Sequence, residues 1–443
     1  MDYDVLVIGT GAAASTAAAA CAKAGLRTAV ADRLPYGGTC ARRGCDPKKV
    51  LLAAAEAKDR SDALAGEGLT GDLRIDWPAL IARKRTFTDP VPAEREAWLS
   101  GVGVDLLHGD VTITGASGDE VTAALDGEPL STGTVVVATG ALSRSLGIPG
   151  EDLLTTSDAF METDDLPASM VFIGGGYVSF EFAHIAHAAG AHVTIVHRSS
   201  RVLKGFDSDL CEALVERYRD MGIDVVTDAP ATEVRRHGER LVVATPKGEF
   251  EAEMVVHGAG RVPDVSRLGL ETAGVEYDGR GVLVDERLRS VSNPRFYAAG
   301  DASALGMPLT PVASRQGGIV AANILGDDMA FDGRATASVV FSDPPLAAVG
   351  VSADEADPDV YEVRHTDMSG WFTQRRLGAT HAAAKLVFEK DTGRLAGAHI
   401  LGPEAAEVIN VFALAVRSGL RREDLAEVVW AYPTAGSDIP YML

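Results

Sequence analysis

Cys40 and Cys45 lie five positions apart in a short segment rich in glycine and basic residues. Over residues 37–49 the chain reads Gly-Gly-Thr-Cys-Ala-Arg-Arg-Gly-Cys-Asp-Pro-Lys-Lys. A thiolate close to a helix N-terminus and to cations has a lowered pKa, which favours thiol–disulfide exchange. The alternative is a pair of inert thiols in a helix, but glycines that allow close packing against a ligand argue against it. We therefore expect a redox-active pair.

The other two cysteines, Cys21 and Cys211, lie in apolar helical patterns, and we expect both to be buried and inert. Four cysteines in 443 residues are too few for a disulfide-stapled secreted scaffold. None has the spacing of a zinc site, so no metal site is expected. A close pair in a reducing compartment is more often catalytic than structural, and we expect a cytoplasmic protein.

Composition and charge exclude several classes of partner. The chain is 46% hydrophobic and 23% charged, as in ordinary globular proteins, and its length favours about two to four domains. The net charge is −22, so nucleic acid and anionic membranes would be repelled. No apolar run approaches the ~20 residues that span a bilayer.

A nucleotide-binding fingerprint follows the apolar run at residues 4–8, which we expect to be a buried parallel strand. Gly9 would allow the tight turn, Gly11 the close approach of a pyrophosphate, and Ala14 the packing of helix on strand. The helix that follows presents N–H groups and the positive end of its dipole to phosphate. Asp32, at the end of the next strand, would bind a ribose hydroxyl. The pattern predicts a dinucleotide site.

A second fingerprint follows the apolar run at residues 170–173. Gly174, Gly176 and Ser179 would play the same three parts there. The two βαβ units, at 4–32 and 170–198, therefore predict an α/β fold with two Rossmann-like domains.

The strand of this second unit does not end in the acidic residue with which an NAD site binds the ribose 2′-hydroxyl. A basic segment with Arg198, Arg201 and Lys204 follows instead. These cations could meet a 2′-phosphate, and the alternative is a solvated basic turn. We favour NADPH at this site.

Further motifs make the sequence resemble the flavoprotein disulfide reductases, the family of glutathione reductase, dihydrolipoamide dehydrogenase and mercuric reductase. The resemblance runs essentially from end to end. It is carried by the cysteine segment at 37–49, Ala-Thr-Gly at 138–140, Gly-Gly-Gly-Tyr-Val-Ser-Phe-Glu at 174–181, Gly-Arg-Val-Pro at 260–263, Ala-Gly-Asp at 299–301, Leu-Thr-Pro-Val-Ala at 309–313 and Phe-Ser-Asp-Pro-Pro at 341–345.

The resemblance implies FAD at the first fingerprint, NADPH at the second, and a C-terminal interface domain that forms a homodimer. From about residue 335 the pattern does change, to strands within 385–400 and a helix at 404–418. We therefore predict a discontinuous FAD-binding domain at 1–145 and 261–330, an NAD(P)H-binding domain at 146–260, and an α+β dimerisation domain at 331–443.

The resemblance also implies roles for individual residues. Cys40 would be the interchange thiol that attacks substrate, and Cys45 would lie against the flavin as the charge-transfer thiolate. Lys49, paired with Glu181, would tune the flavin, and Tyr177 would cover it where nicotinamide docks. Further site residues would be Gly38, Thr39, Thr139, Gly140, Gly300, Asp301 (on the ribityl chain), Thr310 and Ala313 for FAD, and Gly260 and Arg261 for NADPH.

The C-terminal segment departs from the family. Disulfide reductases carry a His before Pro-Thr and a Glu five residues later, where this chain has Tyr432 and Ser437, with Asp438 one position further. A phenol with a pKa of ~10 does not cycle as a base near neutral pH. Tyrosine here resembles mercuric reductase, but the paired C-terminal cysteines of that enzyme are missing. Whether Tyr432 or Asp438 replaces the His–Glu pair stays open.

Charged residues beside the cysteines are a second departure. Asp46 stands where the family usually has an apolar residue, and its charge should disfavour the Cys45 thiolate. Arg42 and Arg43 could steer an anionic substrate or form a solvated helix face.

We expect a homodimeric FAD enzyme that oxidises NADPH and reduces a small disulfide through Cys40 and Cys45, in the manner of glutathione reductase. The alternative acceptor is a metal ion such as Hg(II), or a quinone, for which no histidine acid is required. A third interpretation, a FAD-binding structural or sensor protein, conflicts with the complete second nucleotide site.

Overall fold

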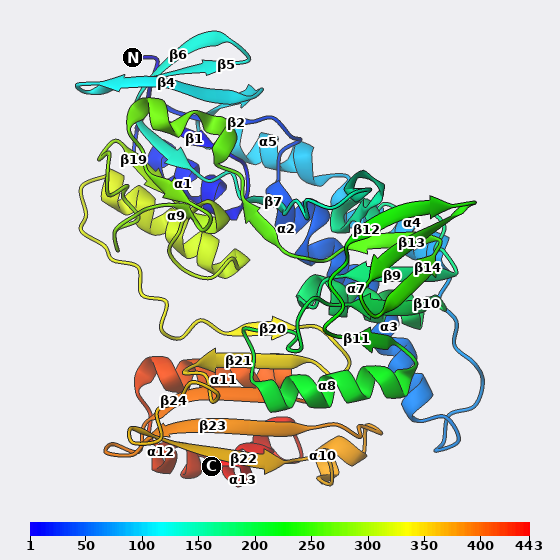
Figure 1. Cartoon of the computed structure of the whole chain (residues 1–443). Helices are drawn as coiled ribbons and strands as arrows, with labels where there is room; N and C mark the ends of the chain where they lie inside the picture. The colour runs from blue at the N-terminus through cyan, green and yellow to red at the C-terminus, as the bar shows by residue number, and fades with distance from the viewer. The chain divides into compact units, whose positions relative to one another are not determined.

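The computed structural model describes residues 1–443, which form two compact units (Figure 1). The first unit comprises residues 1–49, 82–144 and 261–333, and the second comprises 50–81, 145–260 and 334–443. Residues 50–81, which we expected with the first nucleotide-binding domain, belong to the second unit because Leu51, Leu52 and Trp77 lie in its core. The division into three domains stays a prediction. No helix is long and apolar enough to cross a membrane.

The first unit is built on a seven-stranded sheet with the order β3-β2-β1-β6-β5-β4 and with β19 beside β6. Strands β1, β2, β3, β6 and β19 pair in parallel, whereas β4, β5 and β6 form an antiparallel meander. Both faces of β1 are covered, and its last four residues are buried, as the apolar run predicts. The strands are β1 (Tyr3–Ile8), β2 (Thr28–Asp32), β3 (Val104–His108), β4 (Val111–Ser117), β5 (Glu120–Leu125), β6 (Glu128–Val137) and β19 (Phe296–Ala298).

Helices α1 (Ala12–Lys23) and α9 (Thr310–Ile324) pack tightly on each other in this unit. A Cβ at Gly317 of α9 would lie 2.3 Å from the carbonyl oxygen of Ala13, so the contact requires glycine. The remaining elements that reach this unit are α2 (Gly38–Arg43), the start of α3 (Cys45–Ala63), the end of α4 (Trp77–Thr88), α5 (Val91–Gly101), β7 (Ala141–Ser143), β16 (Arg261–Pro263), β17 (Tyr277–Asp278) and β18 (Gly281–Val282).

The second unit contains another parallel sheet, with the order β11-β10-β9-β15-β8. Its strands β9 and β10 flank the second fingerprint, and α7 follows that fingerprint directly. The elements are β8 (Thr155–Thr156), α6 (Ser157–Phe160), β9 (Ser169–Ile173), α7 (Tyr177–Ala188), β10 (His192–Val196), α8 (Ser208–Met221), β11 (Asp224–Val226) and β15 (Met254–His257), with a three-stranded antiparallel sheet of β12 (Glu233–His237), β13 (Arg240–Thr245) and β14 (Gly248–Ala252).

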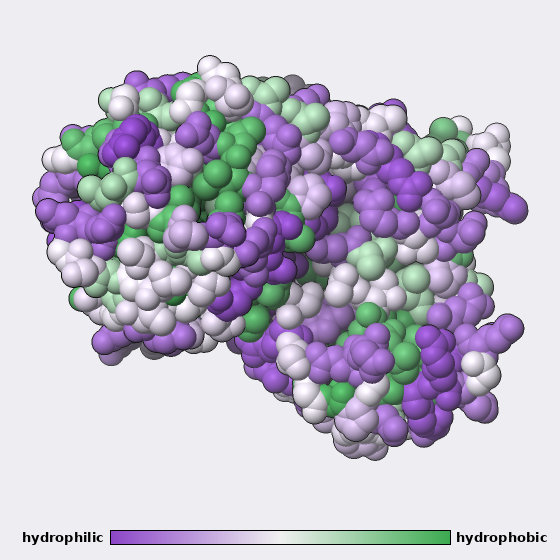
Figure 2. Space-filling model, turned by 90° about the horizontal axis from the view of Figure 1, so that it is seen from above, coloured by the Kyte–Doolittle hydropathy of each residue, from purple (hydrophilic) through white to green (hydrophobic).

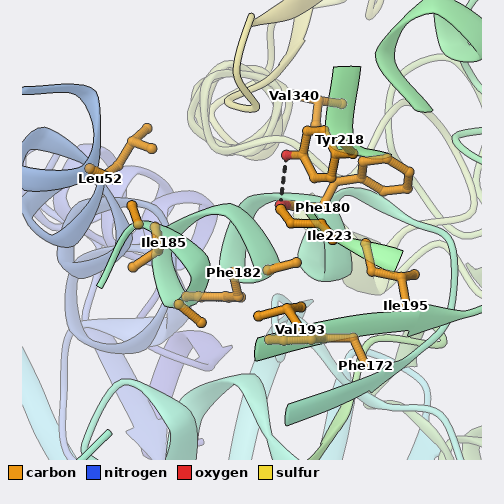
Figure 3. Close-up of a cluster of buried hydrophobic side chains, with 14 of the residues drawn as sticks. Leu52, Phe172, Phe180, Phe182, Ile185, Val193, Ile195, Tyr218, Ile223 and Val340 are labelled. Carbon is orange, nitrogen blue, oxygen red and sulfur yellow. Dashed lines mark hydrogen bonds between the residues drawn. The ribbon is translucent and has the colours of Figure 1, made fainter. Parts of the chain in front are cut away.

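A hydrophobic cluster lies beside this parallel sheet (Figure 3). Side chains from α7, α8 and the strands meet there, and Phe172 and Phe180 are fully buried. The Tyr218 hydroxyl donates a hydrogen bond to the Phe180 carbonyl at 2.9 Å, which satisfies the one polar atom of the tyrosine side chain.

The outer surface has a different composition from this buried cluster. Figure 2 shows hydrophilic side chains over most of one outer face, with hydrophobic groups in smaller patches between them.

The C-terminal part of this unit is an antiparallel sheet with the order β20-β21-β24-β23-β22. Helix α11 buries Val408, Ile409, Phe412 and Ala415, a spacing that places them on one helix face. The predicted change of pattern and the predicted helix at 404–418 are confirmed. The elements are β20 (Ser338–Val340), β21 (Leu346–Gly350), β22 (Tyr361–Asp367), α10 (Phe372–Arg375), β23 (Ala383–Glu389), β24 (Leu395–Leu401), α11 (Ala405–Ser418), α12 (Arg422–Ala426) and α13 (Ile439–Met442).

Candidate redox and cofactor sites

The first fingerprint forms a loop that requires glycine at its first position. Gly9 has φ +112°, and a Cβ there would lie 2.3 Å from the carbonyl oxygen of Ala138. Gly38, at the start of α2, has φ +68°, and its Cβ would lie 2.4 Å from Cα of Gly11. The N-terminus of α2 therefore packs against the fingerprint, where backbone N–H groups can face a pyrophosphate. These residues fit the phosphates of FAD.

Asp32 lies at the end of β2, as the sequence predicts. Its Oδ2 accepts a hydrogen bond from the Thr10 hydroxyl at 2.6 Å, and its Oδ1 accepts one from the Leu34 N–H at 2.9 Å. A carboxylate has about four acceptor positions, so it can also accept a ribose hydroxyl. The two protein contacts fix its orientation for that role.

The Ala-Gly-Asp turn is held by a residue that the sequence analysis did not identify. Gln316, completely buried on α9, accepts a hydrogen bond from the Gly300 N–H at 2.8 Å and donates one to the Leu305 carbonyl at 2.7 Å. Burial raises the pKa of Asp301, and the charge of Arg261 opposes the shift. An isolated glutamine in a helix gives no sequence signal for this role.

A second loop, at Ala-Thr-Gly, is tied to the same unit. The Thr139 hydroxyl donates to the Asp264 carbonyl at 2.7 Å, and the Asp264 N–H donates to the Gly140 carbonyl at 2.9 Å. The predicted small residues Ala14 and Ala313 are both buried. The predicted FAD residues of the first fingerprint, Thr139, Gly140, Asp301 and Thr310 thus all belong to one compact unit.

The cysteines lie on either side of a tight turn between α2 and α3. Gly44 makes this turn, and a Cβ there would lie 2.9 Å from the Thr39 carbonyl oxygen. Cys40 is half-buried and Cys45 is exposed at the first position of α3, and both are free thiols. The Cys45 Sγ lies 3.8 Å from Oγ1 of Thr310, the first residue of α9. Cys45 is therefore near two helix N-termini, which stabilise a thiolate.

The two thiols differ in their affinity for a proton. A hydrogen bond from Cys40 lowers the pKa of Cys45 to about 6, with help from Thr310 and Lys48 and against the effects of burial and Asp46. The same hydrogen bond raises the pKa of Cys40, and burial and the charge of Asp46 raise it further. Both shifts favour the state of the reduced pair in which Cys40 holds the proton and Cys45 carries the negative charge. Cys21 and Cys211 are buried, as predicted.

The second fingerprint repeats the geometry of the first. Gly174 has φ +125°, and a Cβ there would lie 2.2 Å from the Gly258 carbonyl oxygen. Ser179 packs against the same strand end, since a Cβ on Gly258 would lie 2.0 Å from its Oγ. Gly176 directly precedes α7 and leaves its first N–H groups accessible for a phosphate. The loop fits the pyrophosphate of a nicotinamide cofactor.

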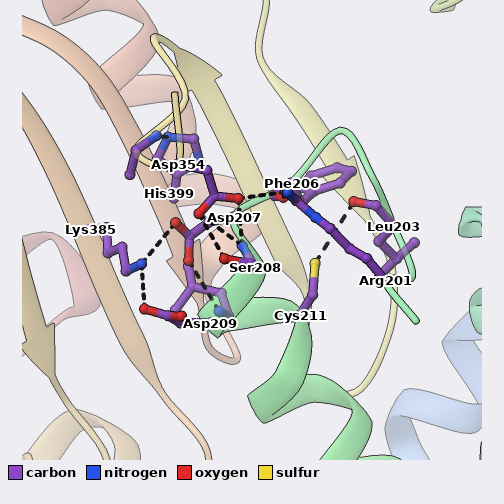
Figure 4. Close-up of polar contacts among 12 residues, drawn as sticks. Arg201, Leu203, Phe206, Asp207, Ser208, Asp209, Cys211, Asp354, Lys385 and His399 are labelled. Atoms are coloured by element: carbon purple, nitrogen blue, oxygen red, sulfur yellow. Dashed lines mark hydrogen bonds and ion pairs between the residues drawn. The ribbon is translucent and has the colours of Figure 1, made fainter. Parts of the chain in front are cut away.

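The three predicted phosphate-binding cations do not have the same surroundings. Arg198 and Lys204 are exposed on the loop after β10. Arg201 instead donates to Asp354 at 2.5 Å and to the Phe206 carbonyl at 2.6 Å (Figure 4). The guanidinium of Arg201 is thus already paired with an acid of the same unit, whereas Arg198 and Lys204 lie exposed on the loop.

Other predicted residues fall in different units. Glu181 is buried in the second unit and accepts a hydrogen bond from the Phe341 N–H at 2.9 Å. Lys49 belongs to the first unit, so its pairing with Glu181 stays a prediction. Gly260 is the last residue of the 145–260 segment of the second unit, whereas Arg261 begins β16 of the first and donates to the Ala141 carbonyl. Tyr177 is the first residue of α7 and is 48% exposed.

The C-terminal turn leaves Tyr432 82% exposed. Ser437 donates through its hydroxyl to the Thr434 carbonyl at 2.6 Å and is held within its own turn. Asp438 is buried and accepts a hydrogen bond from the Thr373 hydroxyl, and burial raises its pKa. Ser437 and Asp438, the two residues considered as partners of residue 432, therefore form their hydrogen bonds with Thr434 and Thr373.

Comparison with known proteins decides the family. The chain matches the pyridine nucleotide-disulphide oxidoreductases over residues 3–317 and their dimerisation domain over residues 336–442. It belongs to this family. The dimerisation domain implies a homodimer, and FAD and NAD(P)H are the typical cofactors. The predicted fold class and family are confirmed.

Curated relatives of similar identity carry three different names. Glutathione reductase of Burkholderia cepacia is 32% identical over 99% of this chain and 97% of its own length. Mercuric reductase of Staphylococcus aureus is 32% identical over 98% of this chain and 80% of its length, and dihydrolipoyl dehydrogenase of Haloferax volcanii is 31% identical over 97% and 93%. The acceptor is therefore not decided by these similarities.

Solved structures agree with the fold. LpdA from Mycobacterium tuberculosis has a TM-score of 0.88 and 27% identity, with coverage of 99% of this chain and 98% of that chain. The Cu(II) complex of the HOCl-induced flavoprotein disulfide reductase RclA from Escherichia coli also has a TM-score of 0.88, at 24% identity over 100% and 99% of the two chains.

Proposed function

We propose that this chain forms a homodimeric, NADPH-dependent oxidoreductase that reduces a small disulfide through Cys40 and Cys45. The observation that carries the proposal is the placement of two free thiols on either side of the turn at Gly44, with Cys45 at the first position of α3 and its Sγ 3.8 Å from Oγ1 of Thr310. Disulfide exchange needs two neighbouring thiols, because Cys40 attacks the acceptor and Cys45 must then reach Cys40 Sγ to resolve the mixed disulfide.

The residues would act in sequence. When bound, FAD supplies the two-electron transfer between the nicotinamide and the disulfide. In the reduced protein, Cys40 loses its proton to solvent and its sulfur attacks one sulfur of the acceptor disulfide, whose other half leaves as a thiolate. The Cys45 thiolate then attacks Cys40 Sγ, restores the Cys40–Cys45 disulfide and releases the second thiolate. Thr310 stabilises the Cys45 charge until that step.

Preference for NADPH rests on Arg198 and Lys204. Both are exposed on the loop where a 2′-phosphate would lie, and the strand before them ends without the acid that favours NAD. Arg201 contributes by holding the following segment to Asp354 rather than by binding phosphate.

A second candidate acceptor is a metal ion or a quinone. Tyr432 replaces the histidine acid of disulfide reduction, and the hydrogen bonds of Ser437 and Asp438 are directed elsewhere. An acceptor that needs no protonated leaving group would not require that histidine.

The test is NADPH oxidation by the purified FAD-loaded protein with neutral, cationic and anionic small disulfides, Hg(II) and quinones. Turnover with a disulfide that disappears in Cys40→Ser supports the proposal. Turnover with a quinone that survives Cys40→Ser, without any disulfide turnover, would assign the flavin itself as the site of reduction. Rapid Hg(II) reduction without disulfide turnover would favour the metal-reducing alternative.

A further inference from the structure

A carboxylate lies beside the thiol that faces the acceptor. The Sγ of Cys40 lies 3.9 Å from Oδ1 of Asp46, so a carboxylate oxygen stands close to the sulfur that would attack the acceptor. Asp46 is exposed in the first turn of α3, directly after Cys45. The turn at Gly44 folds Asp46 back toward Cys40, six positions earlier in the chain.

The groups around Cys40 determine how this contact affects ionisation of the thiol. The principal groups acting on its proton are Cys45, Thr310 and Asp46, and the charges of both Cys45 and Asp46 oppose ionisation of Cys40. On the Cys45 side, Lys48 acts in the opposite sense and stabilises the thiolate. Arg42 lies along Gly37, since its Cγ would be 3.2 Å from a Cβ there. An exposed Asp is negatively charged at neutral pH, so an acceptor at Cys40 meets this charge.

We propose that Asp46 is a specificity-determining residue, which holds the proton on Cys40 and disfavours anionic acceptors. The inference rests on the proposed function and narrows its acceptor to neutral or cationic disulfides. Repulsion between two like unit charges about 4 Å apart slows the reaction of an anionic reagent about fivefold even in water. This difference is enough to distinguish an anionic from a neutral reagent of equal reactivity.

Alkylation of the reduced protein tests this without NADPH turnover or an acceptor. Full-length protein, reduced with dithiothreitol and desalted, is treated with iodoacetamide, which is neutral, or with iodoacetate, which is anionic. Each forms a thioether with a thiolate and releases iodide. Trypsin cleaves after Arg42 and Arg43, so mass spectrometry measures Cys40 and Cys45 on separate peptides.

Asp46→Asn should raise the Cys40 rate with both reagents, because loss of the charge lowers the thiol pKa. The iodoacetate rate should rise about fivefold more than the iodoacetamide rate at low salt, and Asp46→Glu should restore the wild-type ratio. The matched control is Asp62→Asn, an exposed acid on the same helix that pairs with Lys58. An unchanged iodoacetate-to-iodoacetamide ratio in Asp46→Asn would overturn the proposal.

Two further measurements keep the test decisive. Cys21 and Cys211 are buried and must stay unmodified, which checks that the variant is folded. If Asp46→Asn does not fold, the wild-type ratio is measured against salt, and it should rise toward 1 M because screening removes the repulsion. A ratio independent of salt would overturn the proposal. Alkylation of Cys40 does not depend on disulfide turnover, so a protein that shows the charge effect but no disulfide turnover would disprove only the proposed function.

Discussion

The guanidinium of Arg201 lies 2.5 Å from Oδ2 of Asp354, and the same carboxylate accepts hydrogen bonds from the backbone and side chain of Ser208. Nearby, Lys385 contacts Asp207 at 2.9 Å and Asp209 at 2.6 Å (Figure 4). A basic residue that the sequence assigns to cofactor binding is thus part of an ion-pair network within the second unit.

Because Arg201 belongs to this network, we expect it to have a different role from Arg198 in the same loop after β10. Arg198→Gln should raise the KM for NADPH about 10–100-fold, since a charged hydrogen bond to phosphate is lost, and should leave the KM for NADH unchanged. Arg201→Gln should keep the ratio of the two KM values and cost about 1 kcal/mol of stability or less, because the pair is partly exposed. Steady-state kinetics with NADPH and with NADH measure the two KM values for each variant. Loss of NADPH preference in Arg201→Gln alone would contradict the assignment.

Thr310 should help Cys40 to stabilise the charge of Cys45. The rate of Cys45 alkylation by iodoacetamide should titrate with a midpoint near the pKa of about 6, so most of the thiol is ionised at neutral pH. Thr310→Val should move the midpoint upward because a hydrogen bond to the thiolate is lost. Thr310→Ser retains the hydroxyl and is the matched control. The same midpoint in the Val and Ser variants would mean that the helix N-termini, and not the hydroxyl, stabilise the charge.

Tyr432 should be inactive as a base. Tyr432→Phe is expected to change the kcat for a small disulfide by less than about twofold, whereas a general base contributes about 10²–10⁴-fold. Tyr432→His should raise this kcat, and Tyr432→His with Ser437→Glu should raise it further, because the histidine then has a carboxylate to orient it. Rates at saturating NADPH measure the series. A tenfold loss in Tyr432→Phe would show that the phenol takes part in the reaction.

A buried ion pair should make the second unit sensitive to pH. The Nε2 of His184 lies 2.6 Å from Oδ2 of Asp59. Burial acts to lower the pKa of His184, but the hydrogen bond and charge of Asp59 outweigh it and raise the pKa. The pair therefore stabilises the fold fully below the unfolded pKa of about 6.5, and this contribution is lost as pH rises through the folded pKa.

The measurement is Tm at about pH 6 and at about pH 9 for wild type and Asp59→Asn. The variant should lose about 1.5–3 kcal/mol at the lower pH and less at the higher pH, so its Tm should depend less on pH. Asp224→Asn, at the exposed pair with His192, is the control and should behave as wild type. An equal loss at both pH values would show that His184 is neutral in the fold.

Residue type and local spacing were enough to predict the conformation of both glycine loops and of the cysteine turn. Each depends on contacts over a few residues, and the chemistry is set by residue type. Gly9 and Gly174 occupy positive φ values that other side chains rarely adopt, and Ala14 and Ser179 are small where helix meets strand. The parallel strands and helix α11 could also be predicted, because the pattern of apolar residues that indicates them is local in the sequence.

Which charges are already paired depends on contacts between segments that are far apart in the chain. Arg201 and Asp354 are 153 positions apart, and the buried Gln316 supports Gly300 from another element. Asp438 lies next to a predicted catalytic position in the sequence, yet its carboxylate is buried against Thr373, 65 positions away. A charge is satisfied by whatever the fold brings within hydrogen-bond distance, and spacing along the chain does not encode that distance across strands and helices.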